Sequence, residues 1–586
     1  MLFSQLTETF ERLEATTKRL EMFDILSDLL KETNKEEIDK IIYLLQEHIL
    51  PSFYGLELGL AEKMVEKAIA KASNTSQEKI EQLYKKKGDF GLVAEEVLSK
   101  KIAVLFKPKA PTIDEVYQSL SKIAKTSGEG SSSRKIEMLT GLLISVQGKD
   151  AKYIIRFVLG SLRLGVGDPT IMDSLSKVFR EDRTLRGEIE KAYNLCSDLG
   201  LVAKTLYEKG EKGIKDFKAK VFSPIRMALA ERLPNSEEII KKIGKCAIET
   251  KYDGLRIQWH LENNNVEIFS RNLERMTHMF PDLVKGIKEQ IKAKSAIGEG
   301  EAVAFNEETG EFFPFQVTIT RKRKYDIEAS AKDKPLVLFS FDLLYLDGKD
   351  FTGEPYLIRK EKLAKIIKKG FTIREAEKII TDDPKKVEKF FEENIEKGTE
   401  GIMAKRLDSP YQAGGRNFNW IKLKRSYKGE LKDTVDLVII GYFKGKGMRA
   451  KFGIGALLGA AYDKKEDTFK SLAKIGSGLS EEKWVEIRKM LDKLRVERKP
   501  ARVDTIIEPD VYCSPKYVFT VMADEITKSP IHTAGKRKGG DIGYALRFPR
   551  IQGWVRDKNP EDATDTDEII SLFKMQTRVK TIGLGK

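Results

Sequence analysis

One short segment, "KYDGLR" at 251–256, combines residue types that could carry out covalent chemistry. A lysine amine attacks as a nucleophile only when it is neutral, and burial or neighbouring cations lower its pKa toward that state. Arg256 is close to Lys251 in the sequence, and Asp253 lies on the same side of an extended segment as Lys251. Gly254 lets backbone and ligand approach each other closely. The segment therefore indicates a nucleophilic lysine with cations around it, although a surface turn is the more common structure for these residue types.

Several other catalytic chemistries lack their residues in this chain. The sequence contains no G-x-x-x-x-G-K-[ST], no H-E-x-x-H and no G-x-S-x-G pattern. The glycines of "GIGALLG" (453–459) lack the dinucleotide-binding spacing, and the four histidines are not clustered. The chemistry that remains is that of lysine and carboxylate side chains.

Two further segments, "EGEAV" (299–303) and "TEGIMAKR" (399–406), place a carboxylate beside glycine at an expected strand edge. Both suit Mg²⁺, which prefers oxygen ligands. Phe341, in "FSFDLL" (339–344), is by default a core aromatic, and stacking on a nucleotide base is the more specific alternative.

The segment "WIKLK" (420–424) has the alternation of a strand with two different faces. Lys422 and Lys424 point to one face, whereas Ile421 and Leu423 point to the other. Two lysines that converge opposite an apolar face are unusual for a surface strand. They suit a strand that lines a phosphate-binding cleft.

The sequence around these segments predicts a mixed α and β region. Residues 255–261 alternate apolar and polar side chains, "ENNN" (262–265) supplies a turn, and the alternation resumes at 266–268, which predicts a hairpin. The other expected elements are a buried strand in "KPLVLFSFDLLYLDG" (334–348) that ends in an Asp347-Gly348 turn, a helix in "PKKVEKFFEENIEKG" (384–398) and a strand in "GIMAKR" (401–406).

The flanking regions differ from this middle part. Residues 1 to about 215 have helical periodicity, with capping-box spacing at Asn34 and Glu37 and again at Thr112 and Glu115. An apolar stripe follows the first of these boxes and consists of Ile38, Ile41, Ile42 and Leu45. From about residue 431, strand-like segments with short connections surround one expected helix at 480–494, which predicts a small β-barrel.

Composition favours a nucleic-acid partner. The chain has 586 residues with 105 Lys and Arg against 90 Asp and Glu, a net charge of +15 and a pI near 9.2. This excess suits a polyanion, although a basic, well-solvated surface also explains it. Three scattered cysteines support neither a disulfide framework nor a zinc site and fit a reducing cytoplasm. We expect no signal peptide and no membrane span.

Six segments taken together resemble the nucleotidyltransferase motifs of ATP-dependent DNA ligases of the archaeal and eukaryotic replicative type, with the archaeal members closest. In chain order these are "KYDGLR", "FSRN", "EGE", "FSFDLLYLDG", "EGIMAKR" and "WIKLK". The segment at 156–175, "RFVLGSLRLGVGDPTIMDSL", resembles the family's helical DNA-binding domain. The segment at 529–564 resembles the end of its C-terminal OB-fold.

This resemblance implies a multidomain architecture. It comprises an all-α DNA-binding domain (1–215), an α+β nucleotidyltransferase or adenylation domain (216–430) and a β-barrel OB-fold domain (431–586). It also implies a monomeric, cytoplasmic and nucleoid-associated enzyme that seals nicked double-stranded DNA in replication, repair and recombination. ATP would be the AMP donor, with Mg²⁺ or Mn²⁺ as the metal. A sliding clamp is a candidate partner through "SKKIAVLF" (99–106), although an amphipathic core segment is the more common structure for such a sequence.

The family's roles pass to the matching positions around the nucleotide. Lys251 is the implied nucleophile that becomes adenylated, and Glu249 is implied to recognise the adenine amino group. Arg256 and Glu301 are implied to contact the ribose side, and Phe341 to stack on adenine.

The remaining implied residues bind metal or phosphate. The implied metal ligands are Glu301 and Glu400. Lys422 and Lys424 would hold the α-phosphate, and Arg271 and Arg416 would bind the nucleotide and the phosphate of the nick. The family's RxDK motif, which closes over ATP and orients the leaving pyrophosphate, is matched by Arg556, Asp557 and Lys558.

Two alternatives remain open from the sequence. An RNA ligase or an mRNA-capping guanylyltransferase shares the central motifs, but is not expected to carry the helical region matched at 151–175. A non-catalytic scaffold that binds duplexes would explain the charge of +15, but it leaves the converging lysines and carboxylates without a role.

Overall fold

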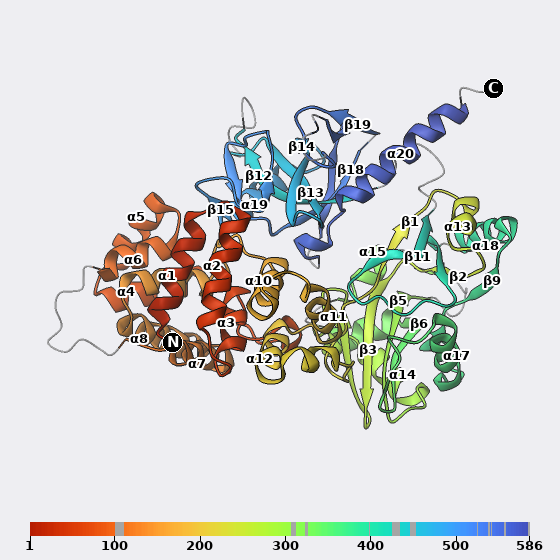
Figure 1. Cartoon of the computed structure of the whole chain (residues 1–586), viewed down its shortest axis with the longest axis horizontal. Coiled ribbons are helices and arrows are strands. Elements are labelled where there is room, and N and C mark those ends of the chain that lie inside the picture. Colours follow the sequence, from red (N-terminus) through yellow and green to blue (C-terminus); the bar gives the residue numbers. More distant parts are fainter. Residues whose placement is uncertain are drawn as a thin grey trace.

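A computed structural model of the chain describes residues 1–99, 110–305, 312–313, 315–322, 326–397, 399–424, 434–445, 453–523, 525–536, 540, 542–555 and 558–583. Helices form the N-terminal part, two sheets with helices form the middle, and a curled sheet forms the C-terminal part (Figure 1). This confirms the predicted fold class. Among the described residues, no helix has the length and apolar character needed to cross a membrane.

The N-terminal part consists of helices that share one core. They are α1 (Phe3–Ala15), α2 (Arg19–Glu32), α3 (Ile38–Leu45), α4 (Glu62–Ser73), α5 (Gln77–Lys87), α6 (Phe90–Ser99), α7 (Ile113–Lys125), α8 (Ser131–Ser145), α9 (Gly148–Val158), α10 (Asp168–Arg180), α11 (Arg186–Cys196) and α12 (Leu199–Lys215).

One of the two capping predictions for these helices is confirmed and the other is wrong. At α7, Thr112 Oγ1 accepts from the Glu115 amide at 3.2 Å, and the Glu115 carboxylate accepts from the Thr112 amide at 2.7 Å. Helix α3, in contrast, begins only at Ile38. The Glu37 carboxylate accepts from the Asn34 side-chain amide at 2.9 Å and pairs with the N-terminal ammonium of Met1 at 2.9 Å, and forms no capping box. The apolar stripe that follows is fully buried, as predicted.

The middle part contains two sheets. The first has the strand order β1 (Leu229–Arg232), β11 (Arg416–Lys424), β10 (Gly401–Arg406), β2 (Cys246–Lys251) and β9 (Lys378–Thr381). Helices α13 (Ser236–Ile243) and α18 (Pro384–Glu396) cover one of its faces, where Ile239, Val387 and Phe391 pack on Ile248, Ile421 and Leu423. The opposite face is left for the second sheet and the site.

The second sheet runs β4 (Asn265–Ser270), β3 (Leu255–Glu262), β5 (Ser295–Ala304), β6 (Leu336–Leu346) and β7 (Lys349–Asp350), with β8 (Ile373–Glu375) beside β6. The helices of this region are α14 (Pro281–Gln290), α15 (Phe315–Ile319), α16 (Ile327–Asp333) and α17 (Tyr356–Ile366). The hairpin prediction is confirmed, since Asn263 and Asn264 turn between β3 and β4 with φ of 48° and 68°. The Asp347-Gly348 turn is also confirmed, with φ of 44° and 91°.

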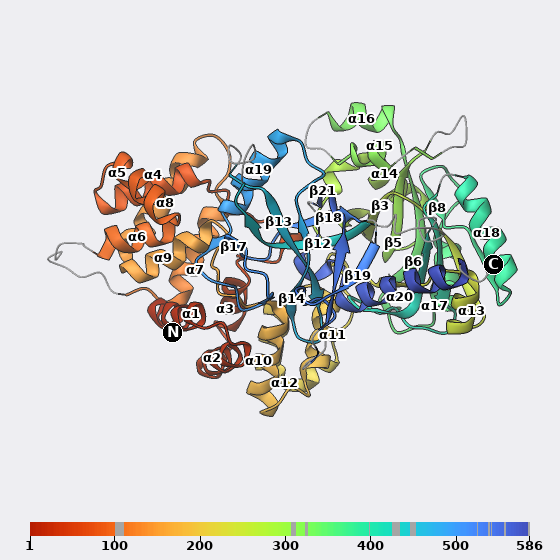
Figure 2. The ribbon, with the colours of Figure 1, turned by 90° about the horizontal axis from the view of Figure 1, so that it is seen from above.

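The C-terminal sheet curls around its own core. Its strands are β12 (Thr434–Phe443), β13 (Ala456–Asp463), β14 (Thr468–Ile475), β15 (Arg495–Val496), β16 (Val503–Asp504), β17 (Val511–Cys513), β18 (Val518–Met522) and β21 (Arg550–Val555), with β19 (Glu525–Ser529) and β20 (Gly543–Arg547) as a separate pair. Strand β12 pairs with β13 along one side and with both β17 and β18 along the other, so the sheet bends around α19 (Glu481–Asp492). Helix α20 (Thr566–Gly583) leaves this part and extends toward the middle part (Figures 1 and 2).

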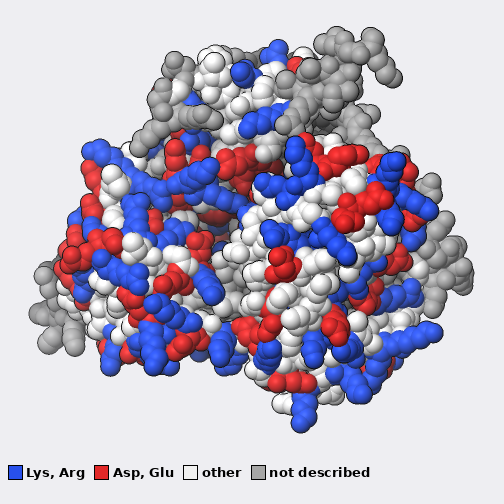
Figure 3. All heavy atoms as spheres, turned by 45° about the vertical axis from the view of Figure 1, so that its right-hand side comes forward, with Lys and Arg blue, Asp and Glu red and all other residues white. Residues whose placement is uncertain are grey.

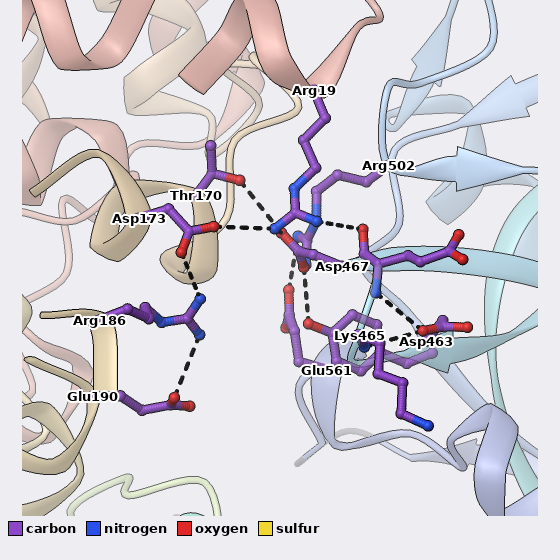
Figure 4. Close-up of polar contacts among 12 residues, drawn as sticks. Arg19, Thr170, Asp173, Arg186, Glu190, Asp463, Lys465, Asp467, Arg502 and Glu561 are labelled. Atoms are coloured by element: carbon purple, nitrogen blue, oxygen red, sulfur yellow. Dashed lines mark hydrogen bonds and ion pairs between the residues drawn. The ribbon is translucent and has the colours of Figure 1, made fainter. Parts of the chain in front are cut away.

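The helical part contacts the C-terminal sheet through buried charges. Asp467, in the turn between β13 and β14, accepts from Arg502 at 2.7 Å and from the Thr170 hydroxyl of α10 at 3.3 Å (Figure 4). Arg19 of α2 lies 3.8 Å from the same carboxylate and 3.3 Å from Asp173. These contacts bring together segments about 300 residues apart in the sequence.

Candidate active site

The predicted site residues of the middle part lie between its two sheets. Because side chains alternate along a strand, Glu249 and Lys251 share one face of β2, and Lys422 and Lys424 share one face of β11. That face is opposite the one covered by α13 and α18, so the alternation predicted for 420–424 is confirmed. Strands β3, β5 and β6 of the second sheet carry Arg256, Glu301 and Phe341.

Carboxylates, rather than cations, are the closest charged neighbours of Lys251. Its amine is paired with Glu400, which is also paired with Lys424. Burial lowers the pKa of Lys251, but the charges of Glu400, Glu301 and Asp253 outweigh it and the net pKa is raised. The expectation of a lysine pKa lowered by surrounding cations is therefore wrong for this arrangement.

Arg256 forms its contacts with other groups than Lys251. Its guanidinium pairs with Glu299 at 2.8 Å and donates to the carbonyl of Ala228 at 2.7 Å. It lies 5.6 Å from the centre of the Phe341 ring. Phe341 is only half-buried and meets Trp420 edge to face, with ring centres 6.0 Å apart. Its ring is thus not closed into the core, which is compatible with the predicted stacking role.

Glu301 and Glu400 have the carboxylate chemistry of metal ligands. Both act electrostatically on Lys251, and burial raises the pKa of Glu301 to about 7. Among the described residues, no group of three or more His, Cys, Asp or Glu side chains is arranged to hold a metal ion. Two carboxylates nevertheless fit Mg²⁺, which proteins commonly hold through one or two carboxylates together with water and substrate phosphates.

Glu249 is enclosed by donors that the sequence analysis did not identify. Its carboxylate contacts Lys360 at 2.8 Å and Lys405 at 2.6 Å, and accepts from the Tyr356 hydroxyl at 2.6 Å. Burial would raise the pKa of Glu249, but the two lysines outweigh it and lower the pKa to about 2. Alternation along 401–406 is sufficient to predict Lys405 on the site face.

A second cluster lies around Lys422. Its charged neighbours include Arg232 of β1 and Arg416 of β11, and burial followed by repulsion from Arg232 lowers the pKa of Lys422 well below its ordinary value. Glu568 of α20 enters this cluster, where it pairs with Arg416 and lies 2.5 Å from Arg232. Sequence patterns could not have indicated Glu568, because it lies 152 residues beyond Arg416 in a helix of the C-terminal part.

Arg271 and Lys558 lie near the junction with the C-terminal part. Arg271 is exposed and interacts electrostatically with Asp562 and Asp436. Lys558 pairs with the same Asp436 at 2.5 Å. Asp253 is exposed close to Lys251. The other two residues of the RxDK motif, Arg556 and Asp557, lie outside the described residues.

A fold of two facing sheets with an enclosed lysine, carboxylates and further lysines between them defines a covalent nucleotidyltransferase. Figure 3 shows acidic and basic side chains interspersed over the face it presents, so the net charge of +15 does not form one basic patch there. The class alone does not separate the members that act on DNA from those that act on RNA.

Comparison with known proteins settles the family. Residues 227–424 match the model of the ATP dependent DNA ligase domain, residues 2–176 that of the DNA ligase N terminus, and residues 450–558 that of the ATP dependent DNA ligase C terminal region. The chain belongs to the ATP-dependent DNA ligase family. This confirms the resemblance seen in the sequence.

Full-length relatives agree with these matches. The chain is 53% identical over 581 residues to a "Probable DNA ligase" of Dictyoglomus thermophilum, with 99% of each chain covered. It is 48% identical over 598 residues to the "DNA ligase" of Hyperthermus butylicus, covering 99% of this chain and 98% of that one. It is also 43% identical over 592 residues to the "DNA ligase" of Saccharolobus solfataricus, with the same coverage.

Proposed function

We propose that this DNA ligase seals nicks in duplex DNA through a lysyl-AMP intermediate formed on Lys251. The observation that carries the proposal is the position of Lys251 on the site face of β2, where it pairs with Glu400 and shares a cross-strand row with Lys424 of β11. The full-length match to relatives named DNA ligase supports DNA as the substrate and disfavours an RNA ligase, a capping enzyme or a non-catalytic scaffold.

The three steps balance as follows. The neutral Lys251 amine attacks the α-phosphorus of ATP, a phosphorus–nitrogen bond forms and pyrophosphate leaves. The AMP then passes to the 5′-phosphate of the nick, which frees the lysine. Finally the 3′-hydroxyl attacks that phosphate, and AMP leaves as the phosphodiester bond forms.

Charge at the site must be rearranged before the first step. Lys251 must lose a proton, which its pairing with Glu400 opposes. Glu301 and Glu400 would hold Mg²⁺ or Mn²⁺, which supplies positive charge beside the amine and the phosphates when bound. Lys422, Lys424 and Arg416 are placed to bind phosphate oxygens once their own carboxylate partners are displaced.

The parts that flank the chemistry suit contact with the DNA backbone. We assign residues 1–215 to DNA binding, 216–430 to adenylation and 431–586 to the OB-fold. Backbone contacts carry no sequence information, so binding should be independent of sequence. We also propose a monomer that acts in the cytoplasm, at the nucleoid, in replication, repair and recombination. The segment considered for a sliding clamp falls almost wholly on residues 100–109, outside the described residues.

The test is covalent labelling of the purified protein with radioactive ATP or GTP, followed by addition of nicked DNA. We expect labelled protein from ATP, and loss of the label with appearance of sealed DNA when the nick is added. Labelling by GTP but not ATP would instead identify a capping-type enzyme. No labelling by either nucleotide would favour the scaffold.

A further inference from the structure

The carboxylate of Glu249 is enclosed on the site face of β2. Only 2% of its side chain is exposed. Its Oε1 atom accepts from the Tyr356 hydroxyl at 2.6 Å and contacts the Lys360 ammonium at 2.8 Å, while Oε2 contacts the Lys405 ammonium at 2.6 Å.

Two of these three donors come from one helix. Helix α17 buries Tyr356, Arg359 and Lys360, which at spacings of three and four residues share one side of the helix. Arg359 pairs with Asp342 of β6 at 2.7 Å and 3.0 Å, with both side chains fully buried. This contact fixes the helix against the second sheet, so that Tyr356 and Lys360 reach across to Glu249 in the first.

Docking the helix does not by itself require this arrangement. Buried ion pairs lose solvation, and well-packed apolar residues of similar size often stabilise a fold as well or better. Here two buried lysines and a tyrosine converge on one carboxylate. That carboxylate lies on the same face as Lys251 and two residues before it, roughly 7 Å along the strand. The position suggests a role in handling the nucleotide.

Counting acceptors shows what the carboxylate can still bind. An ionised carboxylate has about four acceptor positions and no donor. Oε1 accepts from the Tyr356 hydroxyl and is paired with the Lys360 ammonium, whereas Oε2 is paired with the Lys405 ammonium alone. One acceptor position on Oε2 remains. It can take an N–H from an exocyclic amino group, whereas a carbonyl oxygen placed there would be repelled.

We propose that Tyr356 and Lys360 are positioning residues that fix Glu249 as a pure acceptor, and that they thereby make the enzyme select a purine with a 6-amino group over one with a 6-carbonyl group. The inference rests on the proposed function, because Glu249 meets a base only if the site binds ATP. It goes further by assigning base selectivity to α17.

The charges around Glu249 show why Lys360 matters. Tyr356 and Lys360 face the Glu249 carboxylate from α17, and Lys405 faces it from β10. A second carboxylate, that of Glu375, lies 3.6 Å from the Lys360 ammonium. Burial raises the pKa of Glu249 and the two lysines lower it to about 2.

Without the Lys360 charge, Lys405 is the remaining cation that opposes the effect of burial on the pKa of Glu249. The charge of Asp342 also acts on Lys405. The pKa of Glu249 then rises. A protonated carboxyl group can donate to a carbonyl oxygen, so the discrimination weakens and becomes dependent on pH.

The experiment compares adduct formation by the full-length protein from ATP and from inosine triphosphate, which carries a 6-carbonyl group. We expect the unaltered protein to prefer ATP by at least about 10²-fold, because the wrong base leaves a buried acceptor unpaired. Lys360→Met should lower the ratio of adduct formation from ATP to that from inosine triphosphate at least about 10-fold, because the hydrogen bond from the base to an ionised carboxylate is weakened. Its ratio should fall further as the pH is lowered, while that of the unaltered protein stays constant near neutral pH.

Three more variants make the result decisive. Tyr356→Phe removes one hydroxyl from a buried ring and should lower the ratio in the same direction, even if Lys360→Met does not fold. Lys360→Arg keeps the charge and should restore most of the selectivity. Lys365→Met, on the exposed side of α17 where Lys365 pairs with Glu361, is the matched control and should leave the ratio unchanged.

Two outcomes separate this inference from the function beneath it. If folded Lys360→Met and Tyr356→Phe keep the ratio and its pH-independence, their contacts serve only to dock α17 and the inference is overturned. If the unaltered protein forms no adduct with any nucleoside triphosphate, the proposed function itself is overturned.

Discussion

The counter-charges of buried groups at the two ends of the site come from different parts of the chain. At the base end, Glu249 is balanced by Lys360 and Lys405, both from the same part of the chain. At the phosphate end, the cations Arg416 and Arg232 are balanced by Glu568, which α20 carries in from the C-terminal part. Glu249 and its partners thus belong to one part of the chain, whereas Arg416 and Arg232 at the phosphate end depend on a carboxylate from another part.

The proposed function explains this difference by what each end would bind. A base is neutral, so a carboxylate that recognises it needs permanent cations to remain ionised in a buried place. A triphosphate brings its own negative charge, so cations that receive it need a carboxylate only until it arrives. Glu568 and Glu400 therefore occupy positions that phosphate oxygens and metal would take over.

The largest expected effect is at the phosphate end. Lys251→Ala should abolish adduct formation and ATP-driven sealing, because the variant lacks the amine assigned to attack the α-phosphorus. Activity on a nick whose 5′-phosphate is already adenylated should remain measurable, since that step uses the 3′-hydroxyl as nucleophile. Both activities can be followed on gels with labelled ATP and labelled DNA. An adduct still formed by this variant would falsify the assignment of the nucleophile.

Lys422→Ala should slow self-adenylation by about 10²–10³, the usual cost of losing one group that stabilises charge in a transition state. Folding should be maintained, because Lys422 lies opposite the apolar face that holds Ile421 and Leu423. Lys386→Ala, on the exposed side of α18, is the control. A normal adenylation rate in single-turnover measurements would show that the phosphate role of this strand is wrong.

Glu568→Gln tests whether Glu568 neutralises Arg416 and Arg232 until phosphate binds there. Since Glu568 and phosphate compete for Arg416 and Arg232, adduct formation at low ATP should become faster, by roughly three- to tenfold. The melting temperature should fall and added inorganic phosphate should raise it more than in the unaltered protein, because the anion fills the vacated position. Asp567→Asn, which alters the exposed neighbour paired with Lys465, is the matched control. Equal rates for both variants would refute the competition.

Sequence patterns predicted what one strand or one turn determines. Alternation along 420–424 placed Lys422 opposite the apolar face, and the Asn263-Asn264 turn followed from local backbone preference. Patterns failed where the outcome depends on tertiary contacts. Glu400 and Glu301 reach Lys251 from segments distant in the sequence, so the charges around the amine could not be inferred from Arg256. Glu568 lies 152 residues beyond its partner Arg416.

The same limit applies to buried polar residues. Gln258 and His260 fall on the polar side of the β3 alternation, yet both are fully buried. They are satisfied by the backbone amides of Ile225 and Phe222, at 2.8 Å and 2.9 Å. The segment that supplies these amides has no periodicity that would predict the contact.

The smallest effect concerns stability at the base end. The pKa of Glu249 is lowered in the folded chain to about 2 from an ordinary value of 4.5, so its ionised form stabilises the fold above pH 4.5 and this contribution is lost as the pH falls toward 2. Glu249→Gln should therefore lower the unfolding free energy at pH 7 by on the order of 2 to 3 kcal/mol, and the difference from the unaltered protein should shrink below pH 4.5.

Added phosphate should not restore stability to the Glu249→Gln variant, in contrast to Glu568→Gln, because the base end is not a phosphate-binding position. Melting temperatures measured from pH 7 to pH 3, with Glu392→Gln as an exposed control, check both statements. A difference that stays constant with pH would mean that the two lysines do not hold Glu249 ionised, and the contrast between the two ends would be lost.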